Sequence, residues 1–175
     1  DNASIKGNKE VGGLVGLDFY ESTITGCFTR GSVESVDKYT GGIVGKAYST
    51  SISDCYSGAS VKSGNGGYQG GLVGFASAMG GVSTSITNSY STGLINDGVT
   101  AGIIAGGMVG REMVTSNNPA ALTVVGSFWD TEASGQATSA GGAGKTTSEM
   151  QVASLYTNAG WSTGIWNLAD GSYPT

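Results

Sequence analysis

The sequence predicts an all-β fold: a parallel β-helix, or β-solenoid, of about four coils. Three observations carry this prediction. A glycine-rich string recurs at a nearly constant spacing, a second string with an aromatic residue follows each copy, and turn-forming residues separate the short apolar segments. We expect a right-handed coil with about three short strands per turn, closed by a C-terminal cap that contains one short helix.

The glycine-rich string reads Gly-Gly-apolar-Val-Gly and occupies residues 12–16, 41–45, 70–74 and 106–110. Successive copies begin 29, 29 and 36 residues apart. The second string reads apolar-x-x-(Cys or Ser)-aromatic and occupies residues 24–28, 52–56, 86–90 and 124–128. A single coil of this length cannot bury its apolar side chains alone, so the stack of coils is expected to be the cooperative unit.

Stacking places equivalent residues of neighbouring coils about 4.8 Å apart, in ladders. One ladder should hold Leu14, Ile43, Leu72 and Met108, and the next one Val15, Val44, Val73 and Val109. Because neighbours on a strand point to opposite faces, we expect only one of these ladders to fill the coil interior. The glycines are expected to supply positive φ at a corner and to let backbones approach closely.

The chain divides into two regions, solenoid repeats over residues 1–128 and a capping region over residues 129–175. In the second region, Thr146 and Glu149 have the spacing of a capping box, which predicts a helix over residues 148–156. This helix and three tryptophans, Trp129, Trp161 and Trp166, are expected to cover the open end of the stack.

Extra residues are inserted between the repeated strings at 76–84, 96–105 and 112–121. Insertions in a solenoid leave the coil as loops, and loops carry specific contacts more often than ladders do. These three segments are therefore candidates for a binding role.

Composition excludes several classes of protein. Only 12% of the residues are charged, the net charge is −5, and no basic stripe exists, which argues against nucleic-acid binding. No apolar stretch is long enough to predict a membrane span. The chain begins at Asp1 rather than at Met, and we interpret it as a part of a longer or processed polypeptide.

Few residues suggest catalysis or the binding of a cofactor or metal. Histidine is absent, the carboxylates form no ladder, and no catalytic, cofactor-binding or metal-ligating residue is proposed. Gly144-Lys145-Thr146 echoes a phosphate-binding loop, but the glycine required upstream is replaced by Ser139. A calcium ion bound by a single loop stays open.

Two cysteines, Cys27 and Cys55, occupy the same slot in successive coils, and Ser89 and Ser127 fill it later. Parallel Cβ vectors are a poor geometry for bridging. We therefore expect a ladder of small inward side chains, with a disulfide as the alternative.

The repeated strings resemble the GLUG repeat family, whose core reads Gly-Leu-apolar-Gly, as in residues 13–16. Residues 128–130, 141–150 and 166–174 are similar to the tail that follows such repeats. The resemblance implies a location in secreted or cell-surface bacterial proteins, including adhesin-like and immunoglobulin-A-peptidase-like ones. It implies no catalytic residues.

From these observations we expect a non-catalytic structural or adhesive module of a secreted or surface-attached bacterial protein. The expected partners are a host or cell-surface protein or a glycan, and self-association through the solenoid ends stays open. The alternative is a carbohydrate-binding or carbohydrate-active β-helix. In that case Tyr39, Tyr48 and Tyr68 are the candidate ligand contacts, because they lie outside the aromatic ladder.

Overall fold

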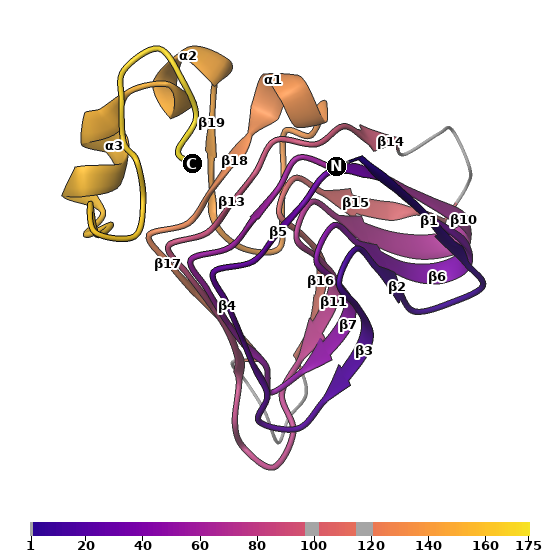
Figure 1. Ribbon diagram of the computed structural model, residues 1–175. Helices are drawn as coiled ribbons and strands as arrows, with labels where there is room; N and C mark the ends of the chain where they lie inside the picture. The colour runs from indigo at the N-terminus through magenta and orange to yellow at the C-terminus, as the bar shows by residue number, and fades with distance from the viewer. Residues whose placement is uncertain (1, 97–101, 115–120) are drawn as a thin grey trace.

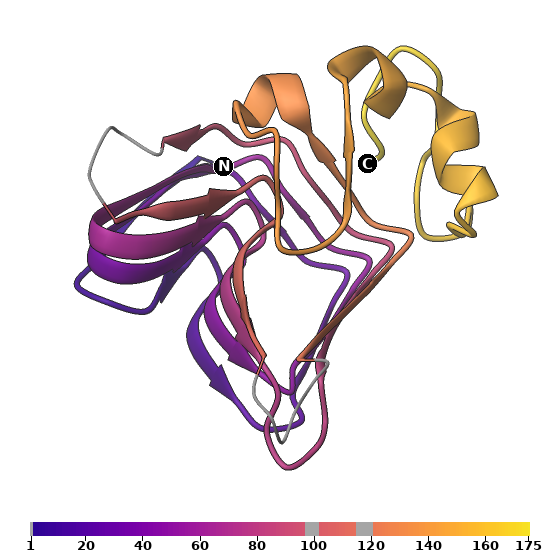
Figure 2. The ribbon, with the colours of Figure 1, turned by 180° about the vertical axis from the view of Figure 1, so that it is seen from behind.

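The computed structural model describes residues 2–96, 102–114 and 121–175, and these form a parallel β-helix with a small helical C-terminal region. In Figure 1 the chain runs clockwise around each coil while later coils recede from the viewer, so the solenoid is right-handed; Figure 2 shows the last coil from behind. The expected fold class is confirmed.

The strands follow in four coils. Coil 1 holds β1 (Ala3–Gly7), β2 (Val11–Gly12), β3 (Val15–Phe19), β4 (Thr23–Thr25) and β5 (Phe28–Thr29). Coil 2 holds β6 (Gly31–Gly41), β7 (Val44–Tyr48), β8 (Ser51–Ser53) and β9 (Tyr56–Ser57). Coil 3 holds β10 (Ser60–Gly70), β11 (Val73–Ser77), β12 (Thr84–Thr87) and β13 (Tyr90–Ser91). Coil 4 holds β14 (Ile95–Asn96), β15 (Ile104–Gly106), β16 (Val109–Met113), β17 (Leu122–Val125) and β18 (Phe128–Asp130).

These strands build four parallel sheets that run along the stack. Sheet A has the order β1-β6-β10-β14, with β2 and β15 also paired to it, and sheet B has the order β16-β11-β7-β3. Sheet C has the order β17-β12-β8-β4. Sheet D has the order β19-β18-β13-β9-β5, in which β19 (Ala143–Lys145) comes from the C-terminal region. Sheet A bends back on itself and projects as an arm from the other three sheets (Figure 1).

The corner between sheets A and B is built by the glycine-rich string. The N–H groups of Ile43 and Val44 both donate to the carbonyl of Leu72 in the next coil, at 2.9 and 3.0 Å. The same paired donation recurs one coil earlier and one coil later. Because the apolar residue lies at the corner and not within a strand, both members of the pair turn inward, and Ile43 and Val44 are fully buried. The expectation that only one ladder fills the interior is therefore wrong.

The glycines at this corner serve close approach rather than positive φ. A Cβ added to Gly41 would collide with the carbonyl of Val44, and one added to Gly42 with the carbonyl of Gly71 in the next coil. Neither glycine has a positive φ. The expected close approach of backbones is confirmed, whereas the expected positive φ at this corner is wrong for Gly41 and Gly42.

A second corner divides the other string into two strands. Gly26, Asp54, Asn88 and Gly126 share one register position, and all have φ between 47° and 62°. Glycine, Asn and Asp tolerate this left-handed conformation best. The chain therefore turns between Ile52 in β8 and Tyr56 in β9, and coils 2 and 3 contain four strands each where about three were expected.

The cysteine slot forms a hydrogen-bonded ladder, and both thiols are free. Backbone N–H groups donate from Cys27 to the Sγ of Cys55 at 3.4 Å, and from Cys55 to the Oγ of Ser89 at 3.1 Å. Each side chain also donates to the carbonyl two residues before it. Burial raises the pKa of the Cys55 thiol to about 11, so this thiol stays protonated at neutral pH. The expected ladder is confirmed.

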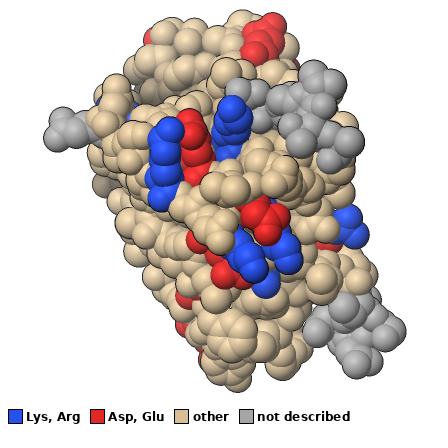
Figure 3. Space-filling view, turned by 90° about the vertical axis from the view of Figure 1, so that its right-hand side faces the viewer, with Lys and Arg blue, Asp and Glu red and all other residues tan. Residues whose placement is uncertain are grey.

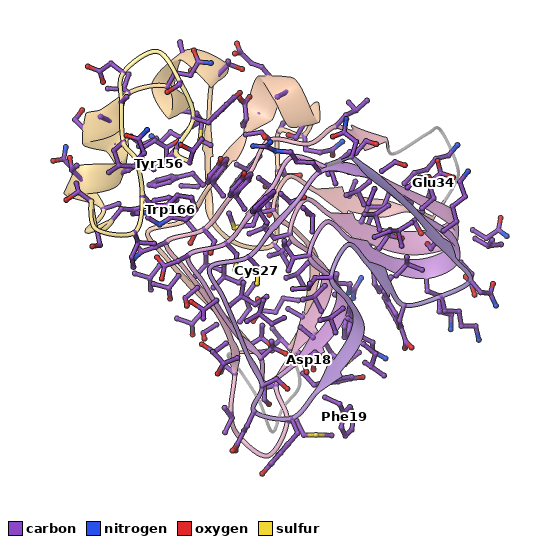
Figure 4. The ribbon with its side chains drawn as sticks, in the orientation of Figure 1. Asp18, Phe19, Cys27, Glu34, Tyr156 and Trp166 are labelled. Carbon is purple, nitrogen blue, oxygen red and sulfur yellow. The ribbon has the colours of Figure 1, made fainter. Side chains whose placement is uncertain are left out.

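One inward column of the stack carries carboxylates at its two ends. Asp18, Ala47, Ala76 and Glu112 share one inward column. Glu112 accepts hydrogen bonds from the backbone N–H groups of Ala121 and Leu122, whereas one buried oxygen of Asp18 has no partner. Figure 4 shows Asp18 and its neighbour Phe19 on opposite sides of β3. Alanine thus occupies the column only where coils lie on both sides.

The C-terminal region covers the outward face of sheet D. Its helices are α1 (Thr131–Ser134), α2 (Thr147–Met150) and α3 (Ala153–Asn158). Stacked rings of Phe28, Tyr56 and Tyr90 lie along sheet D, with centroids 5.1 and 5.0 Å apart. Trp161 and Trp166 pack against Tyr90, and the indole N–H of Trp166 donates to Asp54. The cap therefore holds several coils at once.

The expected single helix over residues 148–156 is wrong, although its capping box at Thr146 and Glu149 is confirmed. The helix is divided near Gln151 by the end of the chain. Asp170 accepts a hydrogen bond from the N–H of Ala153, and the N–H of Gly171 donates to the carbonyl of Gln151. The expected region boundary at residue 128 falls within β18, and sheet D continues into β19.

Buried Asp130 joins the parts of the cap. One carboxylate oxygen accepts from the N–H groups of Glu132 and Ala133 and caps α1. The other accepts from the hydroxyls of Thr147 and Tyr173. Burial and this hydrogen bond raise the pKa of Tyr173 to about 12, which keeps its hydroxyl a donor at neutral pH.

We predict that Ser139→Ala destabilises the stack. The Oγ of Ser139 accepts from the N–H groups of Met108 and Val109, in the place where a further coil would offer a carbonyl. Two buried donors without an acceptor should cost about 1–3 kcal/mol in urea unfolding. Ser172→Ala, at an exposed serine, is the control and should change little. Equal effects of the two substitutions would contradict this role.

Candidate functional site: an aromatic cleft between two sheets

The returning limb of the sheet A arm faces the outer side of sheet B, and side chains fill the cleft between them except beside Ile104 and Arg111, where it is open. One wall carries Tyr39, Tyr68 and Ile104, which are neighbours in register. The other carries Leu17, Lys46, Phe75 and Arg111, one from each coil. The side chains alternate along each strand, so the cleft receives those that face away from the coil interior.

Rings from the two walls pack against each other. Phe75 lies 5.0 Å from Tyr39 and 5.7 Å from Tyr68, measured between ring centroids, and the two tyrosines are 5.5 Å apart. Phe75 is 1% exposed, whereas Tyr39 and Tyr68 are half-buried. The tyrosines therefore cover Phe75 and keep part of their surface open to solvent.

Lys46 places a cation among these rings. Its Nζ lies 4.7 Å from the ring centroid of Tyr39, 5.0 Å from that of Tyr48 and 3.4 Å from an Oε1 of Glu10. Burial alone would lower the pKa of Lys46, but the hydroxyl of Tyr48 and the charge of Glu10 outweigh it, and the pKa is raised. Lys46 thus stays charged and links the arm to sheet B.

At the coil 4 end of the two walls, Ile104 and Arg111 line an open hollow of about 360 Å³. Arg111 lies exposed in its lining, with the guanidinium 5.3 Å from the ring centroid of Tyr68. Thr138 and Ser139 from the capping region also line it. The exposed guanidinium, the hydroxyl of Thr138 and the neighbouring ring of Tyr68 together suit a polar ligand with a flat apolar face.

Three ligand contacts were predicted from the sequence, and all three lie along this cleft. Tyr39 and Tyr68 lie side by side, and Tyr48 meets them through Lys46 and Phe75. Lys46, Phe75 and Arg111, which also line the cleft, were not among the predicted contacts. Each follows the last glycine of a repeated string, so comparison of the strings one residue further would have aligned them.

The three inserted segments were also predicted to be binding candidates. Residues 97–101 and 115–120 of the second and third insertions lie outside the described residues. In the first insertion, the carbonyls of Met79 and Val82 accept hydrogen bonds from the hydroxyl of Ser49 in coil 2. That loop is therefore tied to the coil beneath it.

Within residues 2–96, 102–114 and 121–175, no three side chains among His, Cys, Asp and Glu gather closely enough to hold a metal ion. No helix in the described part of the chain is long and apolar enough to cross a membrane.

We predict that Lys46→Met weakens the attachment of the arm. The substitution keeps the stem of the side chain but removes the charge that contacts Tyr39, Tyr48 and Glu10. A loss of about 1–2 kcal/mol in urea unfolding is expected for a partly desolvated cation over aromatic rings. Lys62→Met, at an exposed lysine on the other limb of the arm, is the control. If both variants unfold alike, the rings do not hold the cation.

Comparison with known proteins identifies the repeat. The family model described as "The GLUG motif" matches residues 37–62, which include the second glycine-rich string. A relative from Evansella cellulosilytica, named as a Gly-rich membrane protein, is 31% identical over 110 residues, covering 62% of this chain and 12% of the relative. No solved structure matches. The match supports the resemblance to the GLUG-motif family: residues 37–62 carry the motif, and their glycine-rich string recurs in the other coils.

Proposed function

We propose that the chain is a non-catalytic structural or adhesive module of a secreted or surface-attached bacterial protein. GLUG-type repeats are typical of extracellular proteins, and the Evansella relative carries a membrane-protein name. The chain corresponds to a small share of that relative's length, as expected for one module among others.

One observation carries this proposal: the residues that define the repeat are engaged with neighbouring coils. The corner N–H groups of coil 2 donate to the carbonyl of Leu72, and the N–H of Cys55 donates to the hydroxyl of Ser89. The ring of Tyr56 stacks on that of Tyr90. A repeat of this kind specifies stacking and leaves the outer surface free to vary.

The outer surface of the arm suits exposure to water. Lys6, Glu34 and Lys62 are neighbours in register, and Lys6 pairs with Glu34 at 3.0 Å. Figure 3 shows charged side chains of both signs gathered over this side of the molecule. Such a face is compatible with display at a cell surface, where a host or cell-surface protein or a glycan would be the partner, and with association between copies.

The test of the modular role is to lengthen the stack by one coil. A second copy of residues 42–70, inserted after Gly70, keeps every ladder in register. We expect the variant to fold, to unfold cooperatively in urea, and to lengthen by about 4.8 Å in small-angle scattering.

The control is the same insertion with its residue order shuffled, which preserves composition and length. We expect this control to lose stability. It offers no carbonyl to accept the two corner N–H groups of the neighbouring coil, and no aromatic ring to continue the stack along sheet D. A duplicated coil that unfolds the protein, or a shuffled one that is tolerated equally well, would overturn the modular role.

The alternative function is carbohydrate binding, or action on carbohydrates, and the aromatic cleft is the observation in its favour. Half-buried Tyr39 and Tyr68 present ring surface beside the exposed guanidinium of Arg111. Sugar rings stack on such surfaces, and a cation would favour an acidic sugar.

A glycan array followed by titration with any glycan retained distinguishes the two functions. If the cleft is a saccharide site, Tyr68→Ala should weaken saturable binding about tenfold or more, whereas Tyr20→Ala, at an exposed tyrosine outside the cleft, should not. No saturable binding and no glycan turnover would remove this alternative and leave the stacking module.

A further inference from the structure

Two cations on the outer face of sheet B, Lys46 and Arg111, each lie beside an aromatic ring of the sheet A arm. The Nζ of Lys46 is 4.7 Å from the ring centroid of Tyr39, and the guanidinium carbon of Arg111 is 5.3 Å from that of Tyr68. Both cations occupy the same outward column, with Phe75 in register between them. The surroundings of the two cations can therefore be compared directly.

The Lys46 position includes a carboxylate supplied by the protein itself. An Oε1 of Glu10, from coil 1, lies 3.4 Å from the Nζ of Lys46. The side chains of Lys46 and Glu10 are only 16% and 32% exposed, so the two charges meet with little access to water. At this position a cation beside an aromatic ring is thus completed by a carboxylate.

The Arg111 position has the cation and the ring, and its surroundings in the described part of the chain supply no such anion. Arg111 is exposed and takes part in none of the ion pairs found among the described residues. Its neighbour Glu112 belongs to the inward column, where its Oε1 accepts from the N–H groups of Ala121 and Leu122. The carboxylate of Glu112 is therefore committed to the loop beneath it.

The hollow beside Arg111 has the size and the chemistry to receive a carboxylated sugar. Its volume of about 360 Å³ lies within the usual range of small-molecule pockets. A carboxylate can accept two parallel hydrogen bonds from a guanidinium, and the apolar face of a sugar ring can lie against the half-buried ring of Tyr68. The hydroxyl of Thr138, which also lines the hollow, suits the hydroxyls of a sugar.

We propose that this hollow binds a uronic-acid residue of an acidic glycan, with its carboxylate on Arg111 and its ring against Tyr68. The proposal rests on the partner in the proposed function and deepens it, since it gives the chemistry of the glycan. The chain has a net charge of −5, so it does not attract polyanions in general. Binding of an acidic glycan therefore depends on the local cation at Arg111.

The test is calorimetric titration of the full chain with an oligogalacturonate and with the methyl ester of the same oligomer. The ester keeps the sugar ring and removes the charge, so the acid should bind at least tenfold more tightly. Arg111→Gln should weaken binding of the acid at least tenfold and remove the difference between acid and ester. Arg30→Gln is the matched control, since Arg30 is also an exposed arginine beside aromatic rings but lies at sheet D, and it should bind as the wild type does.

The comparison of acid with ester uses the wild type alone and does not depend on how the variants fold. Equal affinity for acid and ester, no binding of the acid, or an equal loss in Arg30→Gln would each overturn the proposal. A glutamate-rich peptide that binds as tightly through Arg111 would overturn the assignment to a sugar.

Failure of this site and failure of the proposed function give different results. The coil duplication leaves residues 104–140 unchanged, so a tolerated extra coil without binding of the acid would remove the uronate site alone. Saturable binding of a neutral glycan that is lost in Tyr68→Ala but kept in Arg111→Gln would overturn the acidic ligand and leave carbohydrate binding.

Discussion

The structure depends on one hydrogen-bonding arrangement, in which two successive N–H groups of one coil share a single carbonyl of the next. This geometry requires the backbones to approach so closely that Gly41 and Gly42 have no room for a Cβ. It also turns Ile43 and Val44 inward together, so that each corner buries two apolar side chains instead of one. The direction of sheet B, and with it one wall of the cleft, follows from this corner. Even the capping region conforms to it, since Ser139 supplies an acceptor where no further coil does.

Features that repeat in the sequence were predictable, and features that arise from contacts between distant segments were not. The four glycine-rich strings predict stacking and register, and Thr146 with Glu149 predicts a helix start. The corner at Asp54 was missed because Gly26, Asp54 and Asn88 share a backbone conformation rather than a residue type. The break in the helix near Gln151 was missed because its cause, Asp170, comes from the end of the chain.

The same distinction explains the candidate site. Tyr39, Tyr48 and Tyr68 could be selected because they do not fit the aromatic ladder, but their convergence depends on the arm folding back towards sheet B. Lys46 is held there by Glu10 from coil 1, which no local pattern relates to it. The proposed roles divide accordingly: inward ladders specify stacking, whereas the cleft is the surface proposed to meet a ligand.

The central claim is that corner hydrogen bonds between coils hold the stack, and residue-resolved hydrogen exchange tests it most directly. The amides of Ile43, Val44, Leu72 and Val73 donate to carbonyls of the next coil and are buried. They should exchange only through global unfolding, with an opening free energy equal to that of unfolding and the same for all four. Exchange of these amides as fast as that of the exposed N–H groups of Ser162 and Thr163 would contradict the account.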